Sequence, residues 1–108
     1  MEDVRNAIAE LEAGAQELYL GNKLVGDAEA AALATVLATN RTLKKLSIYS
    51  NRIGPVGARS LAAGLHNNAT LTSLELGYNN IGAEGARLLA AALDNNATLT
   101  SQIGRAHV

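Results

Sequence analysis

The chain has 108 residues and a formal net charge of −1, with 9 Lys and Arg against 10 Asp and Glu. This balance gives no electrostatic basis for binding nucleic acid or an acidic membrane surface. The absence of cysteine excludes disulfides, thiolate metal ligands and a cysteine nucleophile. Three Tyr are the only aromatic residues, so the core must consist of Leu, Ile, Val and Ala.

Residues 1–14 predict an N-terminal helix, because Val4, Ile8 and Leu11 recur at spacings of four and three and so share one helical face. Charged residues are mixed through this segment, so it does not resemble a signal peptide. No apolar run in the chain approaches the ~20 residues that a membrane-spanning helix needs. We therefore expect a cytoplasmic protein without a membrane partner.

A repeat of 28 residues organises the rest of the chain. Segments 43–70 and 71–98 are identical at 16 of 28 positions, and segment 15–42 keeps many of the same Leu, Gly, Asn and Thr positions. A fixed period in this range is typical of stacked repeat proteins. Residues 1–14 are then interpreted as an atypical or partial first repeat. The sequence Leu-Thr-Ser at 99–101 begins a further repeat.

Each repeat predicts a short strand, a tight turn and a helix. The strands alternate apolar and polar residues, which places Leu and Ile inside and the intervening side chains on an exposed face. The strands are Leu18-Tyr19-Leu20, Leu46-Ser47-Ile48 and Leu74-Glu75-Leu76. Helices are expected over 27–39, 55–66 and 83–94, with Asp27 capping the helix that it begins. Their predicted buried stripes are Ala30, Leu33, Ala34 and Leu37, then Ala58, Leu61, Ala62 and Leu65, then Ala86, Leu89, Ala90 and Leu93.

The pattern L-x-x-L-x-L-x-x-N-x-I-G-x-x-G-A-x-x-L-A-x-x-L resembles the leucine-rich repeat family. The 28-residue unit with a full helix resembles the ribonuclease-inhibitor-like subclass, which includes the repeat domains of NOD-like receptors. The resemblance covers 15–101 and implies an α/β solenoid with a short parallel β-sheet on the concave face and α-helices on the convex face. It also implies a structural ladder in which the side-chain amides of Asn51 and Asn79 satisfy backbone groups of the turns. The first full repeat departs from the pattern, because Lys23 occupies the ladder position and Asn22 comes one residue earlier.

In this family the exposed strand face binds partners, so the resemblance implies that the polar strand-face residues form a protein-binding site. All three tyrosines lie on or beside this face, and Tyr is enriched at energetically central positions of interfaces. The candidates are Glu17, Tyr19, Asn22, Lys45, Ser47, Tyr49, Ser50, Ser73, Glu75 and Tyr78.

Enzyme signatures are missing from the sequence. There is no carboxylate–His–Ser grouping, phosphate-binding glycine loop or metal-ligand spacing, so we expect no catalytic residue, cofactor or metal. The predicted function is a non-catalytic protein–protein interaction module from a longer leucine-rich-repeat protein. The alternative is a fragment of a GTPase activator similar to the Ran-GTPase-activating proteins, which share this repeat type. Self-association through an uncapped C-terminal repeat is a further hypothesis.

Two other features have structural or technical interpretations. Asn40, Asn68 and Asn96 fit the N-glycosylation sequon, but their recurrence at one position of each repeat favours a role in the loops. Residues 102–108 read QIGRAHV, which is encoded by a string resembling the start of a common short-read library adapter. We expect this tail to be a sequencing read-through and leave it out of the fold prediction.

Overall fold

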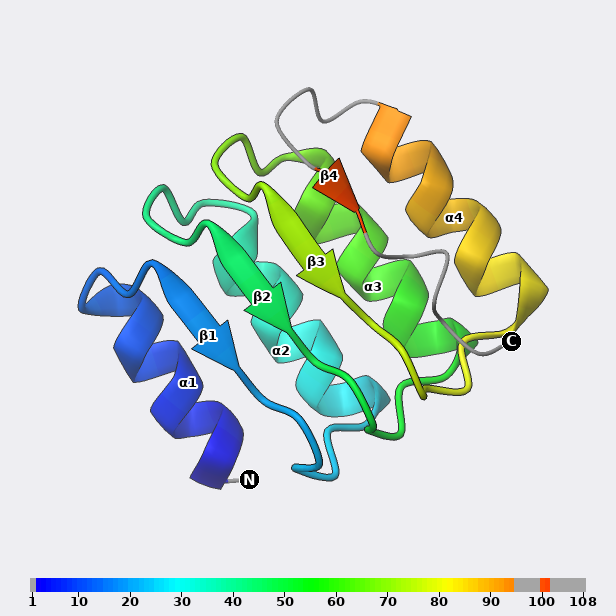
Figure 1. Cartoon of the computed structure of the whole chain (residues 1–108), viewed down its shortest axis with the longest axis horizontal. Coiled ribbons are helices and arrows are strands. Elements are labelled where there is room, and N and C mark those ends of the chain that lie inside the picture. Colours follow the sequence, from blue (N-terminus) through cyan, green and yellow to red (C-terminus); the bar gives the residue numbers. More distant parts are fainter. Residues whose placement is uncertain (1, 95–99, 102–108) are drawn as a thin grey trace.

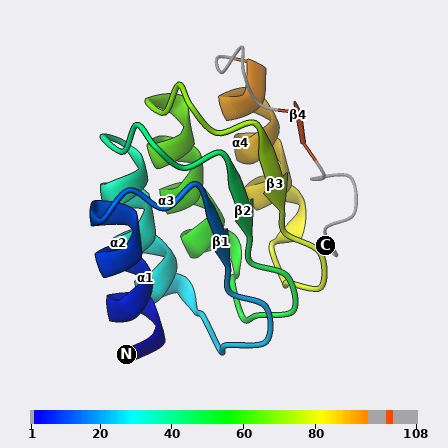
Figure 2. The same cartoon turned by 60° about the vertical axis from the view of Figure 1, so that its left-hand side comes forward.

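The computed structural model describes residues 2–94 and 100–101, which form alternating helices and strands. In chain order these are α1 (Glu2–Glu12), β1 (Glu17–Tyr19), α2 (Asp27–Leu37), β2 (Lys45–Ser47), α3 (Pro55–His66), β3 (Ser73–Glu75), α4 (Gly82–Asp94) and β4 (Thr100–Ser101). The strands form one sheet in the order β1-β2-β3-β4, and the helices lie in a second layer along one face of it (Figures 1 and 2). The predicted α/β repeat solenoid is confirmed.

The strand register follows the repeat. Leu18 pairs with Leu46, and Leu46 pairs with Leu74, so equivalent residues of successive repeats stand side by side in a parallel sheet. β4 lies beside β3, but its register differs by one residue from that of the other strands. Ser73 pairs with Thr100, whereas the 28-residue spacing of the other pairs would join it to Ser101. Residue 99 and the tail over 102–108 lie outside the described residues, so the adapter hypothesis stays a prediction.

One aliphatic core lies between the sheet and the helices. Each repeat contributes a fully buried leucine from its helix, namely Leu33, Leu61 and Leu89. At the first end, α1 buries Val4, Ala7 and Leu11, whereas Ile8 is only partly buried at the edge of that face. Because buried aliphatic area stabilises at about 25 cal/mol per Å², this shared core is the main force that holds the repeats together.

The predicted stripe of α4 is only partly correct. Ala34 and Ala62 are 6% and 8% exposed, but the equivalent Ala90 is exposed and Ala86 is half-buried. Ala62 lines a groove with α4, so the helix of the next repeat covers this position. No helix that follows α4 is among the described residues, and Ala90 is not packed against one there. The side chain of Leu93 lies outside the described residues.

Asp27 does not cap its own helix as predicted. Gly26 holds the N-cap position of α2, and its N–H donates to Glu29 Oε1 at 2.9 Å. Asp27 is therefore the first helical residue, and its carboxylate extends toward the next repeat. There Asp27 Oδ1 accepts hydrogen bonds from the N–H groups of Gly54 (2.8 Å) and Gly57 (3.0 Å) at the start of α3. One carboxylate thus joins two successive repeats.

Candidate functional site

The parallel register arranges the strand-face candidates in two rows across the sheet. Glu17, Lys45 and Ser73 form the first row, and Tyr19, Ser47 and Glu75 form the second. Neighbouring strands stand about 4.8 Å apart, so the members of each row are direct neighbours. The sequence-predicted residues of β1, β2 and β3 are therefore brought together on one surface. We call this surface, together with the turns that follow these three strands, the strand face.

The strand face contains a hollow at the centre of these rows. It has a volume of about 240 Å³ and is lined by Tyr19, Lys45, Leu46, Ser47, Ser73 and Glu75. Side-chain size explains its position, because the small Ser47 lies between the larger Tyr19 and Glu75. The prediction that Ser47 is exposed is wrong: only 4% of Ser47 is exposed, since it forms the floor between taller neighbours.

Hydrogen bonds orient the polar groups around the hollow. The Ser47 hydroxyl donates to Glu75 Oε1 at 2.8 Å, and the Tyr19 hydroxyl donates to Glu17 Oε1 at 2.8 Å. The bond to Glu17, together with partial desolvation and the negative charge of that residue, raises the pKa of Tyr19 above its ordinary value. The Tyr19 phenol is thus tied to the neighbouring carboxylate.

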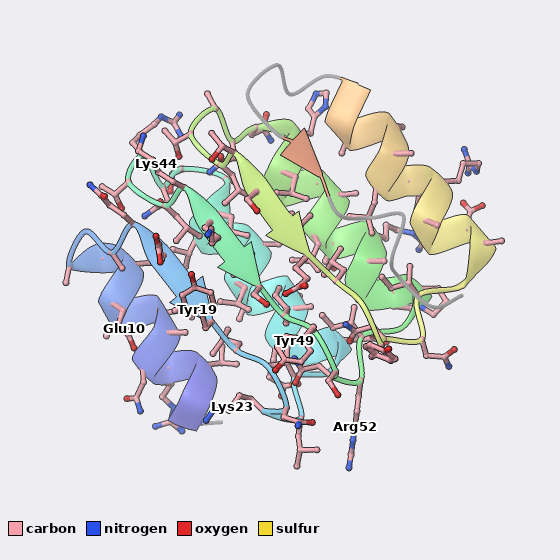
Figure 3. All side chains as sticks on the ribbon, viewed as in Figure 1. Glu10, Tyr19, Lys23, Lys44, Tyr49 and Arg52 are labelled. Atoms are coloured by element: carbon pink, nitrogen blue, oxygen red, sulfur yellow. The ribbon has the colours of Figure 1, made fainter. Side chains whose placement is uncertain are left out.

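Tyr49 lies beyond the end of β2, against the loop that follows β1 (Figure 3). A Cβ atom at Gly21 would overlap Tyr49 Cε1 and lie 2.9 Å from Cζ. The missing side chain of Gly21 therefore provides the space that the Tyr49 ring occupies. This packing leaves Tyr49 44% exposed, compared with 57% for Tyr19 and 67% for Tyr78.

The remaining candidates stand at one position of successive turns. Asn22, Ser50 and Tyr78 have φ values of 59°, 59° and 60°, so each turn passes through the left-handed region at the same point. The Ser50 hydroxyl donates to Asn22 Oδ1 at 3.2 Å, which links the first two turns. Lys23 and Arg52 lie near these turns, whereas Lys44 lies at the opposite end of the strands (Figure 3).

The side chains of Asn51 and Asn79 join adjacent turns. Asn79 is buried. Its amide nitrogen donates hydrogen bonds to the carbonyl groups of Ile48 (2.9 Å) and Leu76 (3.0 Å). Its Oδ1 accepts a hydrogen bond from the Ile53 N–H at 3.0 Å. Asn51 forms the equivalent set with the first repeat, donating to the Leu20 carbonyl at 2.7 Å. Its Oδ1 accepts from the Lys23 and Val25 N–H groups. Each amide therefore serves the turn of the preceding repeat.

A second series of asparagines lies at the opposite end of the strands. Asn68 is only 3% exposed. Its amide nitrogen donates a hydrogen bond to the Leu37 carbonyl at 2.9 Å, and its Oδ1 accepts hydrogen bonds from the Thr70 and Leu71 N–H groups. Asn40 has the same arrangement, with a bond to the Leu11 carbonyl at 3.2 Å. The Asn68 amide, which is buried and holds these bonds, has no room for a glycan. Asn96 lies outside the described residues.

Leu24 is a surface residue that the sequence prediction missed. It has a φ of 60° and is 57% exposed, although the left-handed conformation is unfavourable for a side chain of this kind. The equivalent positions of the next repeats carry Arg52 and Asn80, neither of which has a positive φ. The sequence did contain a signal for this residue, because Leu24 is apolar whereas the equivalent turn positions of the next two repeats are polar. We add Leu24 to the candidates at this end of the strand face.

Within residues 2–94 and 100–101, no group of three or more His, Asp and Glu side chains could hold a metal ion, and no helix is long and apolar enough to cross a membrane. The one ion pair between these residues joins Glu84 and Arg87 on α4. That pair lowers the pKa of Glu84 and raises the pKa of Arg87 through their mutual hydrogen bonds.

Comparison with known proteins supports this architecture at the level of repeats. Residues 39–62 and 67–90 match the family model described as Leucine Rich repeat. Comparison with curated protein sequences gives no match. Among solved structures, the chain is similar to one described as leiomodin-1 actin-binding site 2, with a TM-score of 0.80 and 25% identity over 93% of this chain and 58% of the other.

The tropomodulin C-terminal domain from Caenorhabditis elegans has a TM-score of 0.78 and 19% identity, over 92% of this chain and 62% of the other. This chain thus spans about three-fifths of the length of these two solved chains. Repeat matches and shared architecture agree with the geometry described above. The chain has the fold of a leucine-rich-repeat solenoid, in which a parallel sheet carries the strand face and helices cover the opposite side.

Proposed function

We propose that this chain is a non-catalytic protein-binding module that contacts its partner through the strand face. The observation that carries the proposal is the hollow lined by Tyr19, Ser47 and Glu75, together with the exposure of the Tyr19 ring at this hollow and of the Tyr49 and Tyr78 rings in the turns that follow β2 and β3. Rigid aromatic side chains around a depression are typical of the energetically central part of a protein interface. Short strands in a fixed register hold these groups, so little ordering is needed when a partner binds.

The test compares two triple variants of the chain as affinity baits. One carries Tyr19→Ala, Tyr49→Ala and Tyr78→Ala on the strand face, and the other carries Val56→Ala, Arg59→Ala and His66→Ala on the exposed side of α3. We expect the strand-face variant to lose the proteins that the unmodified chain retains, and the α3 variant to keep them. If the strand-face variant keeps these proteins and the α3 variant loses them, the interface lies on the helical side instead.

Actin is the first partner to test, because one similar solved structure is described as an actin-binding site of leiomodin-1. Fluorescence anisotropy of the labelled chain against monomeric actin, and co-sedimentation with filaments, measure this directly. We expect binding that the three tyrosine substitutions weaken. Equal binding by both triple variants would remove the strand face from the contact with actin.

We further propose that the module belongs to a longer cytoplasmic leucine-rich-repeat protein of the ribonuclease-inhibitor-like, NOD-like-receptor-like type. A full helix in each repeat supports the subclass, and the chain's partial coverage of its solved relatives supports the greater length. Resequencing the source DNA across the codon for Ser101 tests the greater length: further repeats are expected there. The GTPase-activator alternative predicts faster GTP hydrolysis by a small GTPase, and self-association predicts a concentration-dependent mass.

A further inference from the structure

We propose that the hollow on the strand face receives an arginine side chain of the partner, with Glu75 as its ion-pair acceptor and the Tyr19 ring as the surface beside its guanidinium. This inference rests on the proposed function, because it names the chemistry that the strand face recognises. Three observations carry it: the shape of the hollow, the charges around it and the orientation of the Glu75 carboxylate.

The shape of the hollow fits one side chain that enters from outside. Its walls in the second row are Tyr19 on β1 and Glu75 on β3, and these two residues stand two strand spacings apart, on the order of 10 Å between Cα atoms. Ser47 lies between them and is too short to fill the space. A long side chain with a flat head can therefore descend between an aromatic ring and a carboxylate.

The charges favour a cation at this place. Glu75 lines the hollow and Glu17 lies at its edge, bound to the Tyr19 hydroxyl, whereas Lys45 is the cation that lines it. The one ion pair between described residues is on α4, so none of these three charges is ion-paired with another residue of the described part of the chain. Two carboxylates against one ammonium leave an unneutralised negative charge beside an aromatic face.

The Glu75 carboxylate is held in place before any partner arrives. The buried Ser47 hydroxyl donates to Glu75 Oε1, and Glu75 itself is half-buried. An oriented, partly desolvated carboxylate pairs more strongly with a cation than a mobile exposed one does. A guanidinium suits this site better than an ammonium, because it is planar, stacks on aromatic rings and donates two parallel hydrogen bonds to a carboxylate.

The experiment uses the complete chain labelled with ¹⁵N and titrated with N-acetyl-arginine N-methylamide, while amide chemical shifts are recorded. The citrulline analogue is the matched probe, because it has almost the same shape without the charge. We expect saturable shifts at 45–47 and 73–75 with the arginine probe, and much weaker shifts with the citrulline probe. Equal shifts from both probes, or no saturable shift at these residues, would overturn the inference.

Two variants assign the interaction to Glu75. Glu75→Gln keeps the size of the side chain and an oxygen for Ser47, and it should weaken the arginine probe about tenfold or more because the charge-assisted bond is lost. Glu12→Gln makes the same charge change on the exposed surface of α1 and should bind as the unmodified chain does. Unchanged binding by Glu75→Gln would contradict the proposal.

The bait experiment separates this inference from the proposed function. If the partner is lost by the triple tyrosine variant but kept by Glu75→Gln, the strand face is the interface and the arginine inference is wrong. If the triple tyrosine variant keeps the partner, the proposed function itself fails.

Discussion

At the scale of single residues, the structure depends on polar side chains that satisfy the backbone of a neighbouring repeat. Asn79 is the strongest case, because it is buried and bonds to Ile48, Ile53 and Leu76. Short strands and tight turns leave many backbone groups without a strand partner. A buried backbone group without a hydrogen bond costs about 1–3 kcal/mol.

Asn79→Ala should therefore lower the free energy of unfolding by about 3 kcal/mol, since it leaves buried carbonyl and N–H groups unsatisfied. Urea denaturation followed by circular dichroism measures this change. Asn80→Ala alters an exposed neighbour and should stay within about 0.5 kcal/mol. Equal effects of the two substitutions would show that the ladder does not stabilise the fold.

Gly21→Ala tests how Tyr49 is positioned. Gly21 does not lie in the left-handed region, so the backbone accepts alanine there, but the new methyl group would overlap the Tyr49 ring. We expect the ring resonances of Tyr49 to shift in an NMR spectrum while those of Tyr19 and Tyr78 stay in place. Unchanged Tyr49 resonances would mean that the ring does not lie on Gly21.

At the scale of elements, close contact between successive helices is the main packing feature. A Cβ atom at Gly64 of α3 would lie 2.6 Å from the Ala34 carbonyl oxygen and 3.0 Å from its Cα. The backbone of α3 therefore approaches the backbone of α2 at this point. The sequence indicated small residues on these faces, but it could not indicate which of them touch the next helix.

Gly64→Ala gives a test in which two effects have opposite signs. Intrinsic helix propensity favours alanine over glycine by about 1 kcal/mol, so an unrestrained helix would gain stability. Overpacking against Ala34 should instead cost about 1–3 kcal/mol. We expect a net loss of stability by thermal denaturation. A gain would show that α2 and α3 do not approach closely at Gly64.

The turn after β1 is the element that departs most from the repeat. Leu24 holds a left-handed conformation there, whereas Asn tolerates this region better than other side chains do. Leu24→Asn should raise the free energy of unfolding by about 0.5–1 kcal/mol. Arg52→Asn, at the equivalent turn position without a positive φ, should give no such gain. A loss of stability from Leu24→Asn would refute this account of the turn.

At the scale of the whole molecule, stability is shared between repeats that are each too small to fold alone. A domain of this size has only about 5–15 kcal/mol of stability. Leu61 is fully buried in the central repeat, and its truncation should cost about 2–5 kcal/mol.

Leu61→Ala should therefore abolish the cooperative melting transition or move it to a much lower temperature. Circular dichroism during heating measures this outcome. Val56→Ala removes an exposed side chain from the same helix and should leave the transition almost unchanged. A variant at Leu61 with the melting temperature of the unmodified chain would refute the assignment of the core.

The repeat predicted the sheet and helices well, because identical residues at intervals of 28 must occupy equivalent positions in a stack. The pairing of Leu18, Leu46 and Leu74 follows from this spacing alone. The hollow could not be predicted in the same way, because it depends on the sizes of three unlike residues in one row. The contacts of Asp27 and Tyr49 were missed because each reaches into an adjacent repeat.

Site-specific photo-crosslinking can show whether the strand face is the binding surface. A benzophenone amino acid replaces Tyr49 on the strand face in one chain and Val56 on α3 in another; both positions are exposed. If the strand face binds the partner, we expect a covalent adduct from position 49 and none from position 56. An adduct from position 56 alone would contradict it.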